Sequence, residues 1–350
     1  MKDVTVIGLD LAKRVFQVHG VDQHGRVTVQ KRLTRSEVLP WFNRLEPCLV
    51  GIEACATAHY WARELAKLGH QVKLIPPAYV KPYVRRHKND RADAAAICEA
   101  VSRPSMRFAT AKTVEQQAVQ ILHRSRVLLV RQRIQLSNAL RAHLAELGLI
   151  FPLGNVGTLK AIAAVRETEA SDLPDFVRQV LFSLIEQIDR LSREILRLDK
   201  QMNAWHRVNA DSQRLTTIPG IGIVTASAVI SAIGDGKQFH SGREFAAWLG
   251  LVPRQKSSGG KEQLGRISKK GDIYLRQLLV LGATSQLQGK RRDNAPGGAW
   301  LGRLLQRKPA RVATVALANK MARIVWAVLS RGEHYRAPIV RDVAVPAVAS

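Results

Sequence analysis

The sequence predicts an α/β domain at the amino-terminal end, followed by a chain that is mainly helical. Apolar, β-branched runs bounded by turn residues alternate with helical patterns over the first hundred residues, which indicates a mixed sheet with helices. After residue 114, long amphipathic patterns indicate helices instead. A length of 350 residues suits two or three domains, and 46% hydrophobic residues are enough for a folded core.

The first domain is expected to contain five strands, at residues 4–10, 15–21, 26–32, 49–53 and 71–75. Residues 22–25, with the sequence Asp-Gln-His-Gly, form the turn of a hairpin. Helices are expected at 58–68, where Gly69 ends the helix, and at 90–101. Three consecutive strands followed by alternating strands and helices indicate a mixed sheet that begins with a meander.

The middle of the chain is expected to form two long helices, at 116–147 and from 176 to about 205. The second helix carries apolar residues at alternating spacings of three and four, namely Leu181, Leu184, Ile188, Leu191, Ile195, Leu198 and Met202. This heptad seam is typical of a coiled coil, either within a hairpin or between chains. An ordinary bundle helix that packs within its own domain would show the same pattern.

The last part of the chain is expected to form helices at 224–233, 273–286 and 310–329, separated by loops at 250–265 and 290–298. We therefore divide the chain into four parts. These are an α/β domain at 1–110, a helical region for oligomerisation at 111–205, a basic domain at 206–335 and a frayed tail at 336–350.

The net charge of +26 indicates a polyanionic partner, and nucleic acid fits best. The surplus is uneven, because residues 211–350 carry 22 basic and 8 acidic side chains. A basic protein of the ribosome or of a membrane surface is the alternative. No apolar run is long enough to span a membrane, and the spacing of Cys48, Cys55 and Cys98 indicates neither a metal site nor a set of disulfides. These features fit the cytoplasm.

Four acids of the first domain stand where a carboxylate is costly or unusual. Asp10 and Glu53 lie within apolar strands, and burial of a charge requires a compensating partner. Asp90 and Asp93 have the i,i+3 spacing that places both on one face of a helix. Four such carboxylates suit hard divalent cations and phosphoryl transfer. Alternatively, Asp90 is a helix N-cap, Asp93 interacts with the helix dipole, and Asp10 pairs with Lys13 or Arg14.

Three segments of this domain resemble the DEDD transposases of the insertion-sequence one-hundred-and-ten family. They are Gly-Leu-Asp-Leu-Ala-Lys at 8–13, Gly-Ile-Glu-Ala at 51–54 and Lys-Asn-Asp-Arg-Ala-Asp-Ala at 88–94. The resemblance implies an RNase H-like, RuvC-like fold for the first domain. It also implies that Asp10, Glu53, Asp90 and Asp93 are the catalytic DEDD acids and bind two Mg²⁺ ions, with Mn²⁺ as a possible substitute.

The basic domain contains two candidate nucleic-acid contacts. Residues 218–222, with the sequence Ile-Pro-Gly-Ile-Gly, resemble a helix-hairpin-helix element, in which the backbone at Gly220 and Gly222 approaches a phosphate. The loop that follows holds Ser257 and Ser258 and is flanked by six cations: Arg254, Lys256, Lys261, Arg266, Lys269 and Lys270. The composition of the loop favours passive binding of phosphate through its charges. Alternatively, one of its serines attacks a phosphodiester, and the cations stabilise the charge on the phosphorus oxygens. Ser268 reads as a helix N-cap or a phosphate contact.

The loop also resembles the carboxy-terminal transposase domain of the same family. The shared pattern is Pro…Ser-Gly…Gly-x-Ile-Ser-Lys-x-Gly…Leu-Arg, and it implies that a serine is the nucleophile. Ser258, which directly precedes a glycine, fits that position best, and Ser257 is the alternative.

The resemblance implies an enzyme of the bacterial nucleoid that recombines double-stranded donor and target DNA. The acids and Ser258 would form one composite site, a structured bridge RNA would select the sequences, and the chain would act as a dimer or tetramer. Two other classes remain open. One is a metal-dependent junction resolvase or nuclease without a covalent intermediate, and the other is a non-catalytic nucleic-acid-binding protein.

Overall fold

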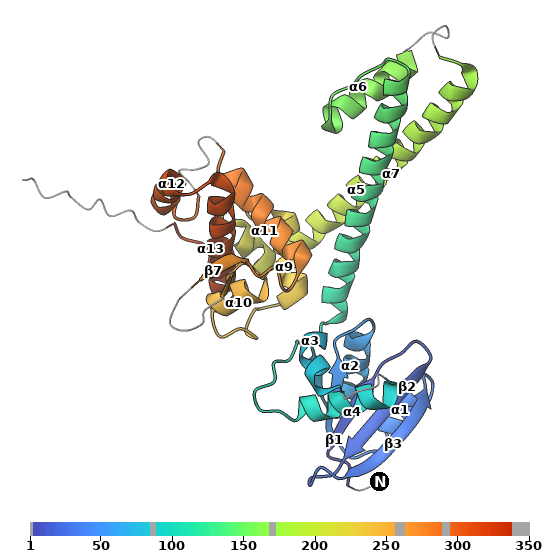
Figure 1. The fold of residues 1–350 in the computed structure, drawn as a ribbon, viewed down its shortest axis with the longest axis vertical. Coiled ribbons are helices and arrows are strands. Elements are labelled where there is room, and N and C mark those ends of the chain that lie inside the picture. The colour runs from blue at the N-terminus through green and yellow to red at the C-terminus, as the bar shows by residue number, and fades with distance from the viewer. Residues whose placement is uncertain (1–2, 85–88, 168–172, 256–262, 289–294, 338–350) are drawn as a thin grey trace, which may run out of the picture. The chain divides into compact units, whose positions relative to one another are not determined.

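The computed structural model describes residues 3–84, 89–167, 173–255, 263–288 and 295–337. The chain divides into two compact units, Met1–Val114 and Glu115–Ser350. Figure 1 shows the α/β unit in blue and cyan, and the helical unit in colours from green to red. Within the second unit, the further division into an oligomerisation region, a basic domain and a tail remains a prediction.

The first unit is built on one mixed five-stranded sheet in the order β3-β2-β1-β4-β5. β1 pairs antiparallel with β2 and parallel with β4, β2 pairs antiparallel with β3, and β4 pairs parallel with β5. The strands span Val6–Asp10, Val15–Val21, Val27–Thr34, Leu49–Glu53 and Gln71–Ile75. All five predicted strands are therefore present, each with its ends within two residues of the prediction, and the mixed sheet fits an RNase H-like DEDD domain.

Helices cover both faces of this sheet. One face packs Ile7, Leu9 and Ile52 against α1 (Val38–Phe42) and α2 (Ala58–Lys67). The opposite face carries α4, which spans Asp90–Val101 as predicted and packs with the end of β5. The short segments α1, α3 (Pro77–Val80) and η1 (Lys81–Tyr83) were not predicted, because so few residues show no helical periodicity.

The second unit begins with the helices α5 (Val114–Glu146), α6 (Gly154–Glu167) and α7 (Asp175–Val208). In Figure 1, α5 and α7 run side by side and α6 lies at their far end. α5 and α7 match the two predicted long helices, whereas α6 was not predicted.

Most of the predicted heptad seam is buried within the chain. Leu181, Ile188, Ile195, Leu198 and Met202 are buried, and Leu181 and Ile188 pack in a core with α5 and α6. Leu184 and Leu191 are half-buried, and the neighbouring Ile185 takes a buried place instead. The seam thus packs within its own unit, and a coiled coil between chains remains a prediction.

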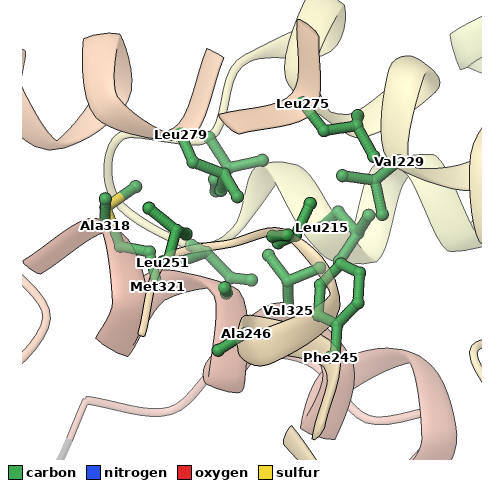
Figure 2. Close-up of a cluster of buried hydrophobic side chains, with 14 of the residues drawn as sticks. Leu215, Val229, Phe245, Ala246, Leu251, Leu275, Leu279, Ala318, Met321 and Val325 are labelled. Carbon is green, nitrogen blue, oxygen red and sulfur yellow. The ribbon is translucent and has the colours of Figure 1, made fainter. Parts of the chain in front are cut away.

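The rest of the second unit is a compact core of helices around one small hairpin. Its elements are α8 (Ala210–Thr216), α9 (Ile223–Ile233), α10 (Gly242–Trp248), β6 (Pro253–Gln255), β7 (Leu264–Ile267), α11 (Ile273–Gln286), α12 (Gly298–Arg307) and α13 (Ala310–Arg331). Figure 2 shows the core, in which Met321 and Val325 of α13 meet Leu215, Phe245 and Leu279. α11 has the predicted bounds, and α9 and α13 lie within two residues of theirs.

One expectation for this region was wrong, and two helices were not expected. Residues 250–265 are not one loop, because β6 and β7 form an antiparallel pair, and α10 and α12 were not predicted. α13 is also long and apolar enough to cross a membrane by length and composition alone. Half of the apolar window of α13 is buried in the protein, and core helices of soluble proteins pass the same test.

Candidate metal centre and nucleic-acid interface

The structure brings together three of the four predicted acids. Asp10 ends β1, while Asp90 and Asp93 lie in the first turn of α4. One carboxylate oxygen from each of these residues lies within 4.8 Å of the other two. Acids that lie 80 positions apart in the sequence thus form a cluster of oxygen ligands at the end of the sheet.

Helix α4 presents these acids because another residue caps it. The side chain of Asn89 accepts a hydrogen bond from the backbone N–H of Ala92, at 2.8 Å. The interpretation of Asp90 as the N-cap is therefore wrong. With the cap made by Asn89, Asp90 and Asp93 occupy the first turn, where the helix dipole favours negative charge.

The close seat of α4 on the sheet depends on two glycines. A Cβ atom on Gly8 would lie 2.1 Å from the carbonyl oxygen of Ala94, and one on Gly51 would lie 2.7 Å from Cβ of Val101. Real Cβ atoms essentially never approach other atoms so closely. Gly8 and Gly51 therefore let the backbone of α4 lie against the strands, which sets the distance between Asp93 and Asp10.

Glu53 ends β4 beside the cluster. β1 and β4 are parallel neighbours with Leu9 opposite Ile52, so Asp10 and Glu53 come next along their strands, on the same face. Burial raises the pKa of Asp10 to about 6, with further contributions from the negative charges of Asp93, Asp90 and Glu53. Glu53 thus acts on Asp10 electrostatically, although it lies outside the tight group of three.

The donor set fits a hard divalent cation. Carboxylate oxygens are the ligands that Mg²⁺ and Mn²⁺ prefer, and a bound cation would offset both the burial of the Asp10 charge and the repulsion from its acidic neighbours, which together raise its pKa. Among the described residues Asp10 forms no ion pair with Lys13 or Arg14, so that alternative is wrong. The cluster therefore gathers carboxylate oxygens of the kind that bind a divalent metal ion.

The turn after Glu53 places a thiol, that of Cys55, beside the acids, and this feature was not predicted from the sequence. Burial raises the pKa of the Cys55 thiol, and the charges of Glu53 and Asp10 raise it further. Thr57, which precedes α2, has a left-handed backbone with φ of 72°. Neither position has a periodic or spacing signal that the sequence alone would show.

In the second unit, the predicted cations gather on the β6–β7 hairpin and the turn that follows it. Arg254, Arg266, Lys269 and Lys270 are all exposed. Arg254 donates to the backbone carbonyl of Ser268 at 3.3 Å, so its guanidinium lies across the hairpin. The α11 N-cap is Asp272, which accepts from the N–H of Leu275 at 2.9 Å, and the N-cap interpretation of Ser268 is therefore wrong.

A buried arginine holds this basic turn in place. Arg276 donates from Nη1 to the carbonyl oxygens of Leu249, at 2.8 Å, and Lys270, at 3.2 Å. Gly250 and Gly271 allow the two segments to touch, since a Cβ on Gly250 would lie 2.1 Å from the Lys270 carbonyl oxygen. Arg276 is part of the matched Leu-Arg pair, but its positioning role appears only in the structure.

The two glycines of the predicted helix-hairpin-helix element have different surroundings. Gly222 is exposed at the start of α9, with nothing within 4 Å of a Cβ built on it. Gly220 instead packs against α11, where a Cβ would lie 2.9 Å from the carbonyl oxygen of Gly282. Of the pair, only Gly222 offers an open backbone at a helix start. Lys256, Ser257, Ser258 and Lys261 lie outside the described residues.

Comparison with known proteins places both units in one family. A family model described as "Transposase", for the DEDD enzymes of IS110 elements, matches residues 7–149. A second model, described as "Transposase IS116/IS110/IS902 family", matches residues 212–295. A protein of Pseudomonas aeruginosa described as "Probable family 20 transposase" is 52% identical over 94% of this chain and 98% of its own length. The chain belongs to the IS110 family of transposases.

Two further relatives of this transposase have names that specify their elements. The transposase for insertion sequence element IS1328 of Yersinia enterocolitica is 42% identical over 95% of this chain and 98% of its own length. The transposase for insertion sequence element IS1111A of Coxiella burnetii is 41% identical over 96% of this chain and 92% of its own length. Membership of this family makes the chain a DNA-cleaving and rejoining enzyme whose DEDD domain depends on divalent metal. The non-catalytic interpretation is thereby wrong.

Proposed function

We propose that this transposase cuts and rejoins donor and target DNA through a covalent bond between Ser258 and a DNA phosphate, assisted by the DEDD acids. The observation that carries the proposal is the meeting of Asp10, Asp90 and Asp93 within 4.8 Å at the end of a mixed sheet. Carboxylates gathered this closely suit a cation next to a phosphate better than they suit a structural ion pair.

Asp10, Asp90 and Asp93 would hold the metal, with Glu53 beside them. Mg²⁺ is the expected ion, and the family resemblance implies two of them. Bound there, they would supply positive charge for the attacking and leaving oxygens of a phosphoryl transfer. The acids themselves fix where that charge lies, since β1, β4 and the first turn of α4 are held by the packing at Gly8 and Gly51.

Ser258 would form the covalent link. Its Oγ loses a proton and bonds to phosphorus, while the bond from phosphorus to the leaving strand breaks and that oxygen departs as a hydroxyl. Attack by the hydroxyl of another strand reverses the exchange and frees the serine, so no external energy source is needed. The support is the matched Ser-Gly motif and the cations around it, of which Arg254, Arg266, Lys269 and Lys270 are exposed on the hairpin.

Trapping of the intermediate tests this step. End-labelled donor DNA is incubated with protein and Mg²⁺, and denaturing gels reveal a label that stays on the protein. Ser258→Ala should abolish the adduct, while Ser257→Ala, the matched neighbour, should keep it. If Ser258→Ala cleaves DNA at the full rate, the serine mechanism is wrong and a resolvase-like nuclease that uses water takes its place.

We also propose that a structured bridge RNA selects the DNA sequences and that the enzyme works as a dimer or tetramer. The support is the family resemblance, together with the net charge of +26, which suits a nucleic-acid partner. Sequencing of RNA that copurifies with the protein should reveal one transcript encoded beside the gene. Random cellular RNA would contradict the guided mechanism, and light scattering measures the subunit number.

A further inference from the structure

The second unit contains a large groove, and most of its lining residues have no role assigned above. One face of α13, the start of α12, the start of α10 and the β6–β7 hairpin line it. Its volume is about 1640 Å³. Pockets for drug-sized ligands hold roughly 300–1,000 Å³, so this groove suits a length of chain better than a single small molecule.

The wall of the groove is apolar because α13 is apolar on two sides. Leu317, Met321 and Val325 are buried in the core, while Val312, Val315 and Ile324 line the groove, where Val315 and Ile324 also pack against the edge of the core. Val312 is 51% exposed. Contiguous apolar surface that stays in contact with water is uncommon away from binding sites, so the wall indicates an occupant with apolar faces of its own.

The rim of the groove is strongly basic. Of its 21 described lining residues, none is acidic and six are cations: Arg243, Arg266, Lys269, Arg311, Lys320 and Arg323. The ammonium of Lys320 lies 4.8 Å from the centre of the Trp300 ring. Burial lowers the pKa of Lys320, and the neighbouring charge of Arg323 lowers it further. An anionic occupant would offset this repulsion.

We infer that the groove binds an unpaired segment of the DNA substrate, with its bases against α13 and its phosphates on the basic rim. Duplex DNA presents phosphates and polar groove edges but keeps its base faces stacked inside, so it matches the rim and not the wall. An unpaired strand offers both an apolar base face and a phosphate at every nucleotide. Strand exchange must pass through such unpaired segments, and to this extent the inference rests on the proposed function.

The lining favours DNA over RNA. The neutral polar side chains among the described lining residues are Ser241 and Asn319. The hydroxyl of Ser241 accepts from the N–H of Glu244 at 3.2 Å to cap α10, and Asn319 donates to the carbonyl oxygen of Leu251 at 3.1 Å. Each already makes one hydrogen bond within the protein, so the lining offers few free neutral groups to a ribose 2′-hydroxyl.

The test is equilibrium binding of the full chain, in EDTA, to labelled single-stranded DNA, the matching duplex and single-stranded RNA. EDTA removes the metal-dependent chemistry, so the result does not depend on Ser258 or on the acids. Val312→Glu introduces a charge into the wall, and Leu281→Glu is its matched control, since Leu281 is 64% exposed on α11 and does not line the groove.

We expect Val312→Glu to weaken binding of single-stranded DNA about tenfold relative to Leu281→Glu, a loss of the size seen when one base contact is removed. The two variants should bind duplex equally, and single-stranded RNA should bind wild type more weakly than DNA does. Equal affinities of the two variants for single-stranded DNA would overturn the groove assignment, and tighter binding of RNA would overturn the choice of DNA.

A second pair of variants tests the rim. Arg311→Ala should weaken binding of single-stranded DNA and lower the slope of log affinity against log salt by about 0.7, the value for one phosphate contact on a single strand. Arg303→Ala, an exposed α12 residue outside the lining, should leave that slope nearer to wild type. Equal slopes in the two variants would count against phosphate contacts at this rim.

Discussion

Gly8 of β1 and Gly51 of β4 are opposite one another in the sheet, and helix α4 lies directly on both. The two glycines remove the side chains that would otherwise hold the helix away from the strands. Because α4 carries Asp90 and Asp93, and β1 carries Asp10, this seat sets the spacing of the acids. Packing between two elements thus decides whether the carboxylates can share a cation.

Gly8→Ala should destabilise the first unit and abolish DNA cleavage. The added methyl group would meet the backbone of α4 at Ala94 and Cys98, and such overpacking costs about 1–3 kcal/mol. Urea unfolding measures the loss. Gly302→Ala is the control, because nothing lies within 4 Å of its Cβ position and a helical alanine adds up to about 1 kcal/mol. Full activity in Gly8→Ala would show that α4 can move without affecting the site.

Asp10→Asn should make the metal-free protein more stable and remove its response to metal. The change takes away a charge that burial and three neighbouring acids disfavour. In a thermal-shift experiment, wild type should melt higher with Mn²⁺ or Mg²⁺ than with EDTA, and Asp10→Asn should melt at one temperature in both. Asp22→Asn, in the turn between β2 and β3, should keep the wild-type response. A retained metal shift in Asp10→Asn would place the ion elsewhere.

Arg276→Met should loosen the basic turn and reduce DNA cleavage while leaving the metal response intact. The carbonyl oxygens of Leu249 and Lys270 lose a charged hydrogen-bond donor, which lowers the free energy of unfolding by about 2–4 kcal/mol. Cleavage assays and thermal shifts with Mn²⁺ report the two effects separately. Arg276→Lys should be intermediate, and Arg193→Met, on the exposed side of α7, should be neutral. Wild-type cleavage by Arg276→Met would show that the turn needs no anchor.

Stability should fall as the pH drops from 6.5 to about 4, in part because of His123. This histidine is buried between Tyr274 and Ser227, each at 3.0 Å. The Ser227 hydroxyl donates to the carbonyl oxygen of Ile223, so it accepts from Nε2–H, which leaves Nδ1 to accept from Tyr274. Burial, with a smaller contribution from Arg126, lowers the pKa of His123 from 6.5 to about 4.

The direction of this change in stability with pH follows from where protons bind. Between these two values the unfolded chain binds a proton and the folded one does not, so stability is present above pH 6.5 and is lost towards pH 4, by about 3 kcal/mol. Melting curves across this range should be flatter for His123→Gln than for wild type, whereas His334→Gln, at an exposed position, should follow wild type. An unchanged slope in His123→Gln would contradict this account.

Much of the first unit could be predicted from the sequence because its central strands, β1 and β4, are apolar on both faces and its turns are marked. The placing of Asp10 and Glu53 in strands, and of Asp90 and Asp93 on one helix face, followed from the same patterns, although Asp10 lies at the end of its strand and not in the middle. The choice of Asn89 as the N-cap of α4 could not be predicted, because Asn and Asp are nearly equally good N-cap residues and both occur there.

The second unit was harder to predict for identifiable reasons. β6 and β7 are short and mostly exposed, so no alternation of apolar and polar residues marks them. The groove depends on four elements that come together only after folding. Its one sequence signal is that α13 has more apolar residues than a single buried face requires.

The placement of α13 between the core and the groove has a consequence for engineering how tightly this enzyme holds unpaired DNA. Its buried residues stabilise the fold of the domain, and its more exposed residues face the groove. Libraries that randomise the whole helix would mix loss of folding with change of affinity. Diversity confined to Val312 and the cations around it, with Leu317, Met321 and Val325 held fixed, would let selection act on affinity alone.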